Sequence, residues 1–146
     1  MISLPWTMAS LRRIAPNVMA IGLASLAMGA SSQELKIVLS GSQEIPPVTT
    51  AASGTAAITV NGDKSVTGNA TIAGMVVTVA HIHEGAAGTN GPIILPLVKT
   101  ADNVWSVPPG ARLSDSQYES YKAGNLYFNI HSEAHRSGEI RGQIKR

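Results

Sequence analysis

Histidine is the residue type in this chain best suited to chemistry, and its four copies fall into two short groups. His81 and His83 are separated by one residue, and His131 and His135 by three. On a strand, side chains two residues apart leave the same face with their backbones about 7 Å apart, and two imidazoles can bridge that span to one ion about 2 Å from each nitrogen. If the strands carrying the two groups are neighbours, the sequence predicts one metal site formed by His81, His83, His131 and His135. The alternative for each histidine alone is a surface or core residue with ordinary hydrogen bonds.

The available donor atoms narrow the choice of ion. The chain has no cysteine, so thiolate coordination is excluded. Imidazoles suit copper(II), zinc or nickel, and the affinity series of the divalent ions favours copper. We therefore expect a copper ion, with zinc as the alternative. Four bound histidines would give a closed site for storage, transport or structural stabilisation, whereas three would leave a position open to water and to chemistry.

Four charged residues close to the histidines in sequence are candidates for orienting the imidazoles. They are Glu84, Glu133, Glu139 and Arg141. Glu84 or Glu133 could instead complete the coordination of the ion. A metal-bound imidazole commonly donates its second N–H to a carboxylate, a carbonyl or water, which fixes the orientation of the ring. The ordinary alternatives are a solvated loop charge for Glu84 or Glu133, and an ion pair between Glu139 and Arg141.

The first residues have the pattern of a secretory signal peptide. Arg12 and Arg13 precede an apolar stretch over residues 14–28, and small residues occupy positions 29–32. An apolar stretch of about 15 residues falls short of the roughly 20 that a spanning helix needs. We expect residues 1–30 to be cleaved on export, leaving a domain over residues 31–146 that is periplasmic or secreted and has no membrane span.

Cleavage would also remove the excess positive charge. Of the eleven Lys and Arg residues, Arg12 and Arg13 lie in the signal segment, so nine remain against nine Asp and Glu. A nearly neutral domain lacks the basic patch that nucleic-acid binding requires, so we expect no nucleic-acid partner. No serine lies in a Gly-x-Ser-x-Gly elbow and no Gly-rich phosphate loop opens a helix, so the sequence predicts no catalytic residues and no nucleotide site.

The remaining sequence alternates between apolar and polar residues, with frequent turn signals and little helical periodicity. Asn61 and Gly62 form the strongest hairpin signal. Ser114 with Gln117 predicts a capping box at the start of one helix, over residues 114–122, and Gly124 stands where a helix terminator belongs. These features predict an all-β Greek-key sandwich or barrel of seven or eight antiparallel strands with one short helix. The expected strands cover residues 35–40, 54–60, 65–72, 75–83, 92–97, 104–107, 125–131 and 139–144.

Three segments resemble the CHRD domain, a family named after the repeats of chordin and present in many bacterial exported proteins. They read LSGSQEIPPV at residues 39–48, AHIHEGAAGTNGP at 80–92, and GNLYFNIHSEAH at 124–135 running into GEIRGQ at 138–143. The resemblance implies a β-sandwich-like module outside the cytoplasm. In chordin-like proteins such modules look like protein-interaction units, so it also supports a metal-free interaction or adhesion module with a protein partner.

A looser similarity, over residues 81–85, is to copper-zinc superoxide dismutase, which also carries a His-x-His pair on a strand of a Greek-key sandwich. The chain has too few histidines for a bridged copper-zinc pair and no cysteine for that family's disulfide. A dismutase-like redox enzyme is therefore a further alternative. The leading hypothesis is a non-enzymatic, exported metal-binding protein.

Overall fold

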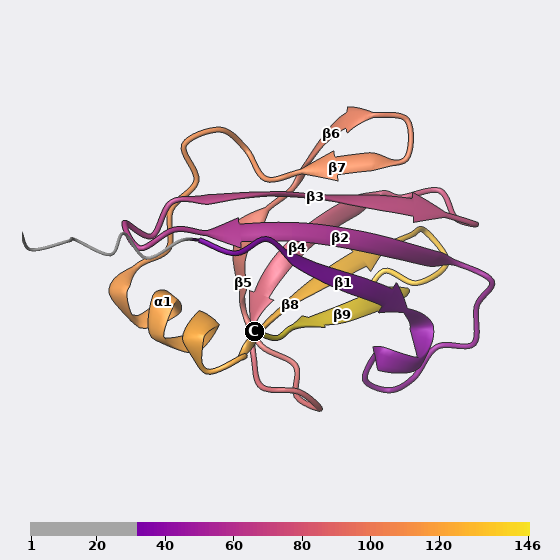
Figure 1. The fold of residues 1–146 in the computed structure, drawn as a ribbon. Helices are drawn as coiled ribbons and strands as arrows, with labels where there is room; N and C mark the ends of the chain where they lie inside the picture. Colours follow the sequence, from indigo (N-terminus) through magenta and orange to yellow (C-terminus); the bar gives the residue numbers. More distant parts are fainter. Residues whose placement is uncertain (1–31) are drawn as a thin grey trace, which may run out of the picture.

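The computed structural model describes residues 32–146, and the expected signal peptide at residues 1–30 lies outside the described residues. The described chain is all-β with a single α-helix, as the sequence predicts, and it has nine strands instead of seven or eight (Figure 1). The elements are β1 Leu35–Ser40, η1 Gly41–Gln43, β2 Ser53–Val60, β3 Val66–Ala73, β4 Val79–Glu84, β5 Ile93–Pro96, β6 Val98–Ala101, β7 Val104–Ser106, α1 Asp115–Lys122, β8 Leu126–His131 and β9 Ile140–Ile144.

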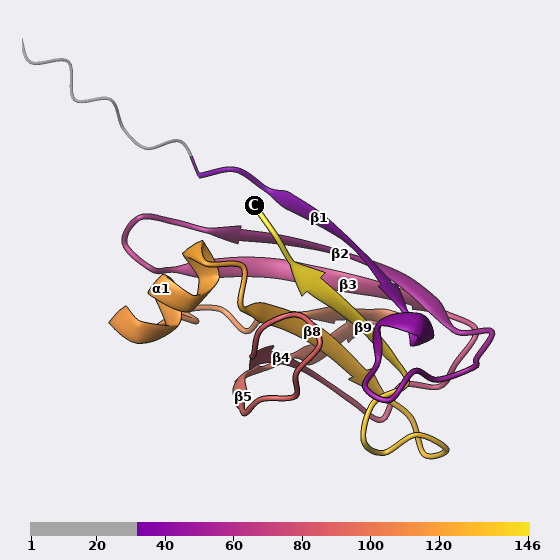
Figure 2. The ribbon, with the colours of Figure 1, turned by 90° about the horizontal axis from the view of Figure 1, so that it is seen from below.

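All nine strands belong to one antiparallel sheet in the order β5-β4-β8-β9-β1-β2-β3-β7-β6. The end strands β5 and β6 are separated in sequence by Leu97 alone, so the two edges of the sheet lie close together. The sheet therefore curls into a nearly closed barrel. Strands β1 and β9 are joined at one residue pair, Ser40 with Arg141, which divides the barrel into two layers (Figures 1 and 2). One layer is β5-β4-β8-β9 and the other is β1-β2-β3-β7-β6.

The hydrophobic core fills the space between the two layers. Alternate residues of β1 are buried there, because successive side chains of a strand point to opposite faces. Ile82 of β4 and Phe128 and Ile130 of β8 are fully buried on the inner face of the opposite layer. The period-2 pattern of the sequence thus specifies which face of each strand enters the core.

The outer face of β4, β8 and β9 carries a second, polar layer of side chains. His81 pairs with Asn129, and Asn129 pairs with Arg141 on the far side of β8. Residues directly opposite each other share a face of the sheet. The polar layer therefore consists of His81, His83, Tyr127, Asn129, His131, Arg141 and Gln143.

Two loops, residues 41–50 and 85–91, contribute side chains to the cover of the polar layer. Asn90 of one loop donates its side-chain amide to the Ile45 carbonyl of the other, at 3.1 Å. As a result Asn129 and Arg141 are buried, although both are polar and face away from the core. Every residue of β8 is buried, because the core covers one face of this strand and the polar layer covers the other.

The two local signals in the sequence are confirmed. The Ser114 hydroxyl accepts from the Gln117 N–H at 3.2 Å, the Gln117 side chain accepts from the Ser114 N–H at 2.9 Å, and Gly124 follows the helix with φ 78°. A hairpin joins β2 to β3 at Asn61-Gly62, although the left-handed residue of this turn is Lys64. No helix within residues 32–146 is both long and apolar enough to cross a membrane.

Two strand predictions require correction. The strand expected over residues 75–83 begins at Val79, because its partner β8 ends at His131 and the Thr78 N–H closes the ladder on the His131 carbonyl at 2.9 Å. The strand expected over residues 92–97 is β5, and a further strand, β6, begins at Val98. Leu97 is the point where the chain passes from one edge of the sheet to the other.

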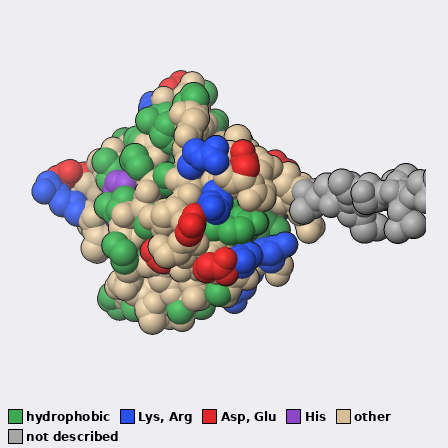
Figure 3. All heavy atoms as spheres, turned by 90° about the vertical axis from the view of Figure 1, so that its left-hand side faces the viewer, with side chains coloured by type: hydrophobic (Ala, Val, Ile, Leu, Met, Phe, Trp, Pro, Cys, Tyr) green, Lys and Arg blue, Asp and Glu red, His purple; other side chains and the backbone are tan. Residues whose placement is uncertain are grey.

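Opposite charges are interspersed on the described surface. Lys64 pairs with Asp115 at 2.6 Å and Lys122 with Glu119 at 2.7 Å. On the face shown in Figure 3, the Lys and Arg side chains lie beside Asp and Glu side chains. This face presents no single basic patch.

Candidate metal centre

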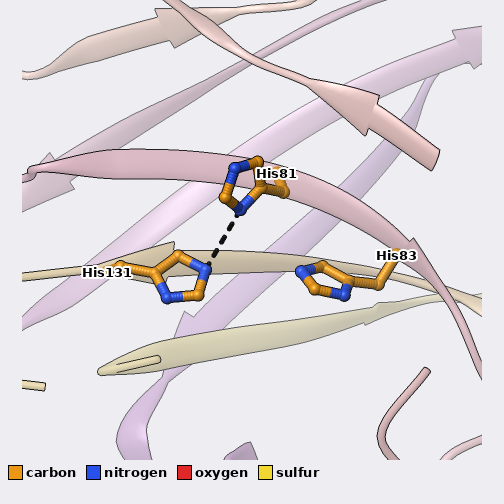
Figure 4. A group of neighbouring side chains, drawn as sticks. All are labelled: His81, His83 and His131. Carbon is orange, nitrogen blue, oxygen red and sulfur yellow. Dashed lines mark hydrogen bonds between the residues drawn. The ribbon is translucent and has the colours of Figure 1, made fainter. Parts of the chain in front are cut away.

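Strand pairing brings three of the four histidines together. Strands β4 and β8 are neighbours, as the predicted site requires, and His131 lies opposite Val79, one diagonal step from His81. The ring nitrogens that His81, His83 and His131 offer all lie within 4.8 Å of one another. Figure 4 shows the three imidazoles converging on one space, with His81 and His83 from β4 and His131 from β8.

The spacing of these nitrogens approaches that of ligands sharing an ion. His81 Nδ1 and His131 Nε2 are 3.2 Å apart. Two nitrogens bound tetrahedrally at about 2.0–2.1 Å from one zinc ion lie about 3.4 Å apart. Since all three ligand atoms are within 4.8 Å, each remaining separation needs to close by at most about 1.4 Å.

Backbone carbonyls fix the orientation of two of the rings. His83 Nδ1 lies 2.8 Å from the Gly91 carbonyl oxygen, and His131 Nδ1 lies 2.9 Å from the Arg136 carbonyl oxygen. A carbonyl only accepts, so in both neutral rings Nδ1 carries the proton and Nε2 carries the lone pair. His83 Nε2 is buried and has no hydrogen-bond partner among the described residues. The two rings therefore present lone pairs, as metal ligands must.

His81 is the third member of the group. A bound ion would change which of its ring nitrogens carries the proton. Its Nδ1 faces the lone pair of His131 Nε2, so without an ion it donates a hydrogen bond to that atom. Both nitrogens would have to offer lone pairs to a bound ion, and the neutral His81 ring would then carry its proton on Nε2 instead of Nδ1.

Burial lowers the pKa of all three histidines. For His81, the nearby imidazoles of His131 and His83 lower the pKa further. For His83 and His131, the carbonyl that accepts from Nδ1 partly offsets the effect of burial. The group is consequently held in the neutral form that binds metal.

Comparison with known families identifies the domain. The family model of the CHRD domain matches residues 35–144, from the first residue of β1 to the last residue of β9. This chain belongs to the CHRD domain family. CHRD domains occur in extracellular proteins. Searches of curated proteins and of solved structures found no match. The family match confirms the resemblance to the CHRD domain seen in the sequence.

In this CHRD domain the fourth histidine, His135, lies outside the group formed by His81, His83 and His131. His135 lies four residues beyond His131, in the turn after β8, where the ladder no longer dictates the direction of the side chain. Its backbone shapes this turn, because its N–H donates to the Ser132 hydroxyl at 3.1 Å and its carbonyl accepts from Gly138 at 3.1 Å. The structure thus assembles three imidazoles where the spacing predicts four.

The three candidate carboxylates bind other partners. Glu84 accepts from the Ser120 hydroxyl at 2.5 Å, and Glu133 pairs with Arg136 at the surface. Glu139 accepts from the Thr50 hydroxyl at 2.6 Å. Within the described residues none of the three forms a hydrogen bond to an imidazole of the group.

The groups that orient the rings are main-chain atoms of Gly91 and Arg136, and side-chain type gives no signal for them. The nearest hint in the sequence is the Gly-rich stretch at residues 85–91, which predicts a tight loop beside the site.

Arg141 reaches the site through Tyr127. Its guanidinium lies 3.4 Å from the centroid of the Tyr127 ring, and that ring stacks on His83 with centroids 4.9 Å apart. The ion pair with Glu139 that the sequence suggested is not formed within the described residues. Glu139 lies just before β9, and the Arg141 guanidinium instead donates to Thr89 and Asn90 in the loop at residues 85–91.

Proposed function

We propose that this CHRD domain is an exported metal-binding domain in which His81, His83 and His131 hold one transition-metal ion. The observation that carries the proposal is the buried lone pair of His83 Nε2, which faces two further imidazole nitrogens and has no partner among the described residues. A buried acceptor without a hydrogen bond costs about 1–3 kcal/mol. A bound ion would satisfy it.

Copper is the favoured ion, with zinc second. The donor set is nitrogen only, which suits both ions, and the divalent affinity series places copper first. The carbonyls of Gly91 and Arg136 already fix the proton on the opposite ring nitrogen, as commonly found for metal-ligating histidines. We propose storage, transport or stabilisation of the fold as the role of this site, in the periplasm or outside the cell.

Three protein ligands do not complete a tetrahedral shell, and the fourth place is then available to water or to a small ligand. Glu84, Glu133 and Glu139 each engage another side chain. His81 is partly exposed, so solvent can approach the group from its side.

Metal analysis of the untagged mature domain tests the proposal. The protein is offered copper or zinc, the excess is dialysed away, and the retained metal is measured. We expect about one equivalent in the wild type and in the matched control His135→Ala, and none in the double variant His81→Ala/His83→Ala. Retention of a full equivalent by the double variant would exclude this site, and no retention by the wild type would favour the metal-free interaction module.

A further inference from the structure

The loop at residues 85–91 is held against the polar layer by hydrogen bonds from the buried Arg141 and the partly buried Gln143. Arg141, which is 2% exposed, donates to the Thr89 carbonyl at 2.7 Å and to the Asn90 side-chain oxygen at 3.1 Å. Gln143 donates to the Gly85 carbonyl at 2.9 Å. Residues at both ends of the loop are therefore held by β9, two strands away from the β4 histidines.

Tyr127 lies between Arg141, which holds the loop at residues 85–91, and His83 of the candidate metal centre. Strands β4 and β9 flank β8 on opposite sides, so the His83 imidazole and the Arg141 guanidinium cover opposite faces of the Tyr127 ring. The planes of the His83 and Tyr127 rings are inclined by only 13°. A cation over an aromatic face is attracted by the ring quadrupole, which strengthens the stack on the β9 side.

The backbone of Gly91 forms hydrogen bonds with both Tyr127 and His83. Its N–H donates to the Tyr127 hydroxyl at 3.0 Å, and its carbonyl accepts from His83 Nδ1 at 2.8 Å. A side chain at this position would overlap the Glu84 carbonyl oxygen, so the close approach requires glycine. Anything that displaces the Gly91 carbonyl removes the acceptor that keeps the His83 proton on Nδ1.

We infer that Arg141 and Tyr127 are positioning residues that keep His83 in its Nδ1–H form and thereby reserve Nε2 for the metal ion. Arg141 holds the loop, Tyr127 holds the Gly91 N–H and the imidazole plane, and the Gly91 carbonyl selects the tautomer. This inference rests on the proposed function for the role of Nε2. The tautomer itself is a property of the metal-free protein and can be measured there.

The test uses the variant Tyr127→Phe, which removes one hydroxyl and keeps the stacked ring. Its matched control is Tyr121→Phe, which removes the hydroxyl of another buried tyrosine, on helix α1. The imidazole ¹⁵N chemical shifts of metal-free, ¹⁵N-histidine-labelled protein at pH 8 report the tautomer. We expect Nδ1–H at His83 in the wild type and the control, and a measurable Nε2–H population in Tyr127→Phe.

A second variant, Arg141→Lys, keeps the charge and removes the planar fork that binds two groups of the loop at once. We expect a larger Nε2–H population than in Tyr127→Phe, and a rise in the Kd for copper of about 10–100-fold, as is typical when a partner of a metal-ligating histidine is lost. If Arg141→Lys does not fold, Tyr127→Phe alone decides.

Different results would reject the inference about the His83 tautomer and the proposed metal-binding function. A His83 that stays wholly in the Nδ1–H form in the folded variants would overturn the inference even if the wild type binds copper. A tautomer that shifts as expected in a protein that binds no metal would support the positioning of His83 and would reject the metal-binding function.

Discussion

His83 and Tyr127 lie directly opposite each other on β4 and β8, and their rings stack with centroids 4.9 Å apart and planes inclined by 13°. The stack and the hydrogen bond to the Gly91 carbonyl restrain the His83 ring in different directions, so rotation of the ring breaks both. A ligand held in this way loses little conformational entropy when it binds an ion.

We expect binding of the proposed ion to stabilise the domain. A ligand that binds only the folded state at 100 times its Kd adds about 2.7 kcal/mol to the free energy of unfolding, which raises Tm by several degrees in a domain of this size. We expect this rise for the wild type with copper, measured by a thermal melt monitored by circular dichroism. The variant His81→Ala/His83→Ala should show no such rise, and an equal rise in both proteins would locate binding elsewhere.

His131 contributes to the stability of the fold as well as to the candidate metal centre. It is 7% exposed, and its two nitrogens lie 2.9 Å from the Arg136 carbonyl and 3.2 Å from His81 Nδ1. His131→Ala leaves both partners unpaired, so we expect the free energy of unfolding of the metal-free domain to fall by about 1–3 kcal/mol and metal retention to be lost. Urea unfolding measures the first effect. The comparison variant His135→Ala alters a residue outside the group and should retain metal.

The stability of the metal-free domain should depend on pH in the range where histidine titrates. Burial lowers the folded pKa of His81, His83 and His131, so protons bind preferentially to the unfolded chain, in which the pKa is about 6.5. The stabilising effect of the neutral rings is complete above that value and is lost as the pH falls through the folded pKa values. We expect Tm to fall between pH 7 and pH 5, more steeply in the wild type than in His81→Ala/His83→Ala. Equal slopes in the two proteins would contradict the assignment of neutral buried rings.

Local rules explain what the sequence predicts well. The alternation of apolar and polar residues in β1 and the capping box at Ser114 and Gln117 follow from residue order and local turn chemistry. The pairing of the two histidine-bearing strands is a condition of the predicted site that the sequence leaves open and the structure meets. The spacing of His81 and His83 fixes their common face, because the period of a strand is two.

The rest depends on contacts between distant segments. His135 follows the last residue of β8, so strand periodicity does not place it. The unexpected strand β6 follows β5 after Leu97 alone, because the chain passes there from one edge of the sheet to the other and the barrel nearly closes. The Gly91 carbonyl and the Arg141–Tyr127–His83 stack arise when β4, β8, β9 and one loop come together. The side chains alone indicate neither feature.

Gly91 should tolerate no side chain. A Cβ there overlaps the Glu84 carbonyl oxygen, whereas a Cβ at Gly62 in the β2–β3 turn meets nothing within 4 Å. We expect Gly91→Ala to lower the free energy of unfolding by at least about 1–3 kcal/mol, the usual cost of overpacking, and to weaken metal binding as the Gly91 carbonyl moves. Gly62→Ala is the control and should change the free energy of unfolding by less than about 0.5 kcal/mol. Urea unfolding of both variants makes the comparison, and equal stability would show that the loop relaxes freely.

The buried carboxyl of Glu44 gives the domain an opposite pH response. Glu44 is 5% exposed, and burial raises its pKa although hydrogen bonding to Asn129 and the charge of Arg141 oppose the shift. Oxygen atoms of both Glu44 and Asn129 are buried without a hydrogen-bond donor among the described residues.

A folded pKa above the unfolded one means that the stabilising effect is present at low pH and is lost as the pH rises through the folded pKa. Glu44→Gln supplies a neutral side chain with an amide donor, so we expect it to melt higher than the wild type at pH 7 and to lose this advantage at pH 4. The exposed Glu34→Gln is the control and should leave Tm unchanged at both values. A Glu44→Gln variant that is less stable than the wild type at pH 7 would show that the ionised carboxylate, attracted by the charge of Arg141, stabilises the polar layer.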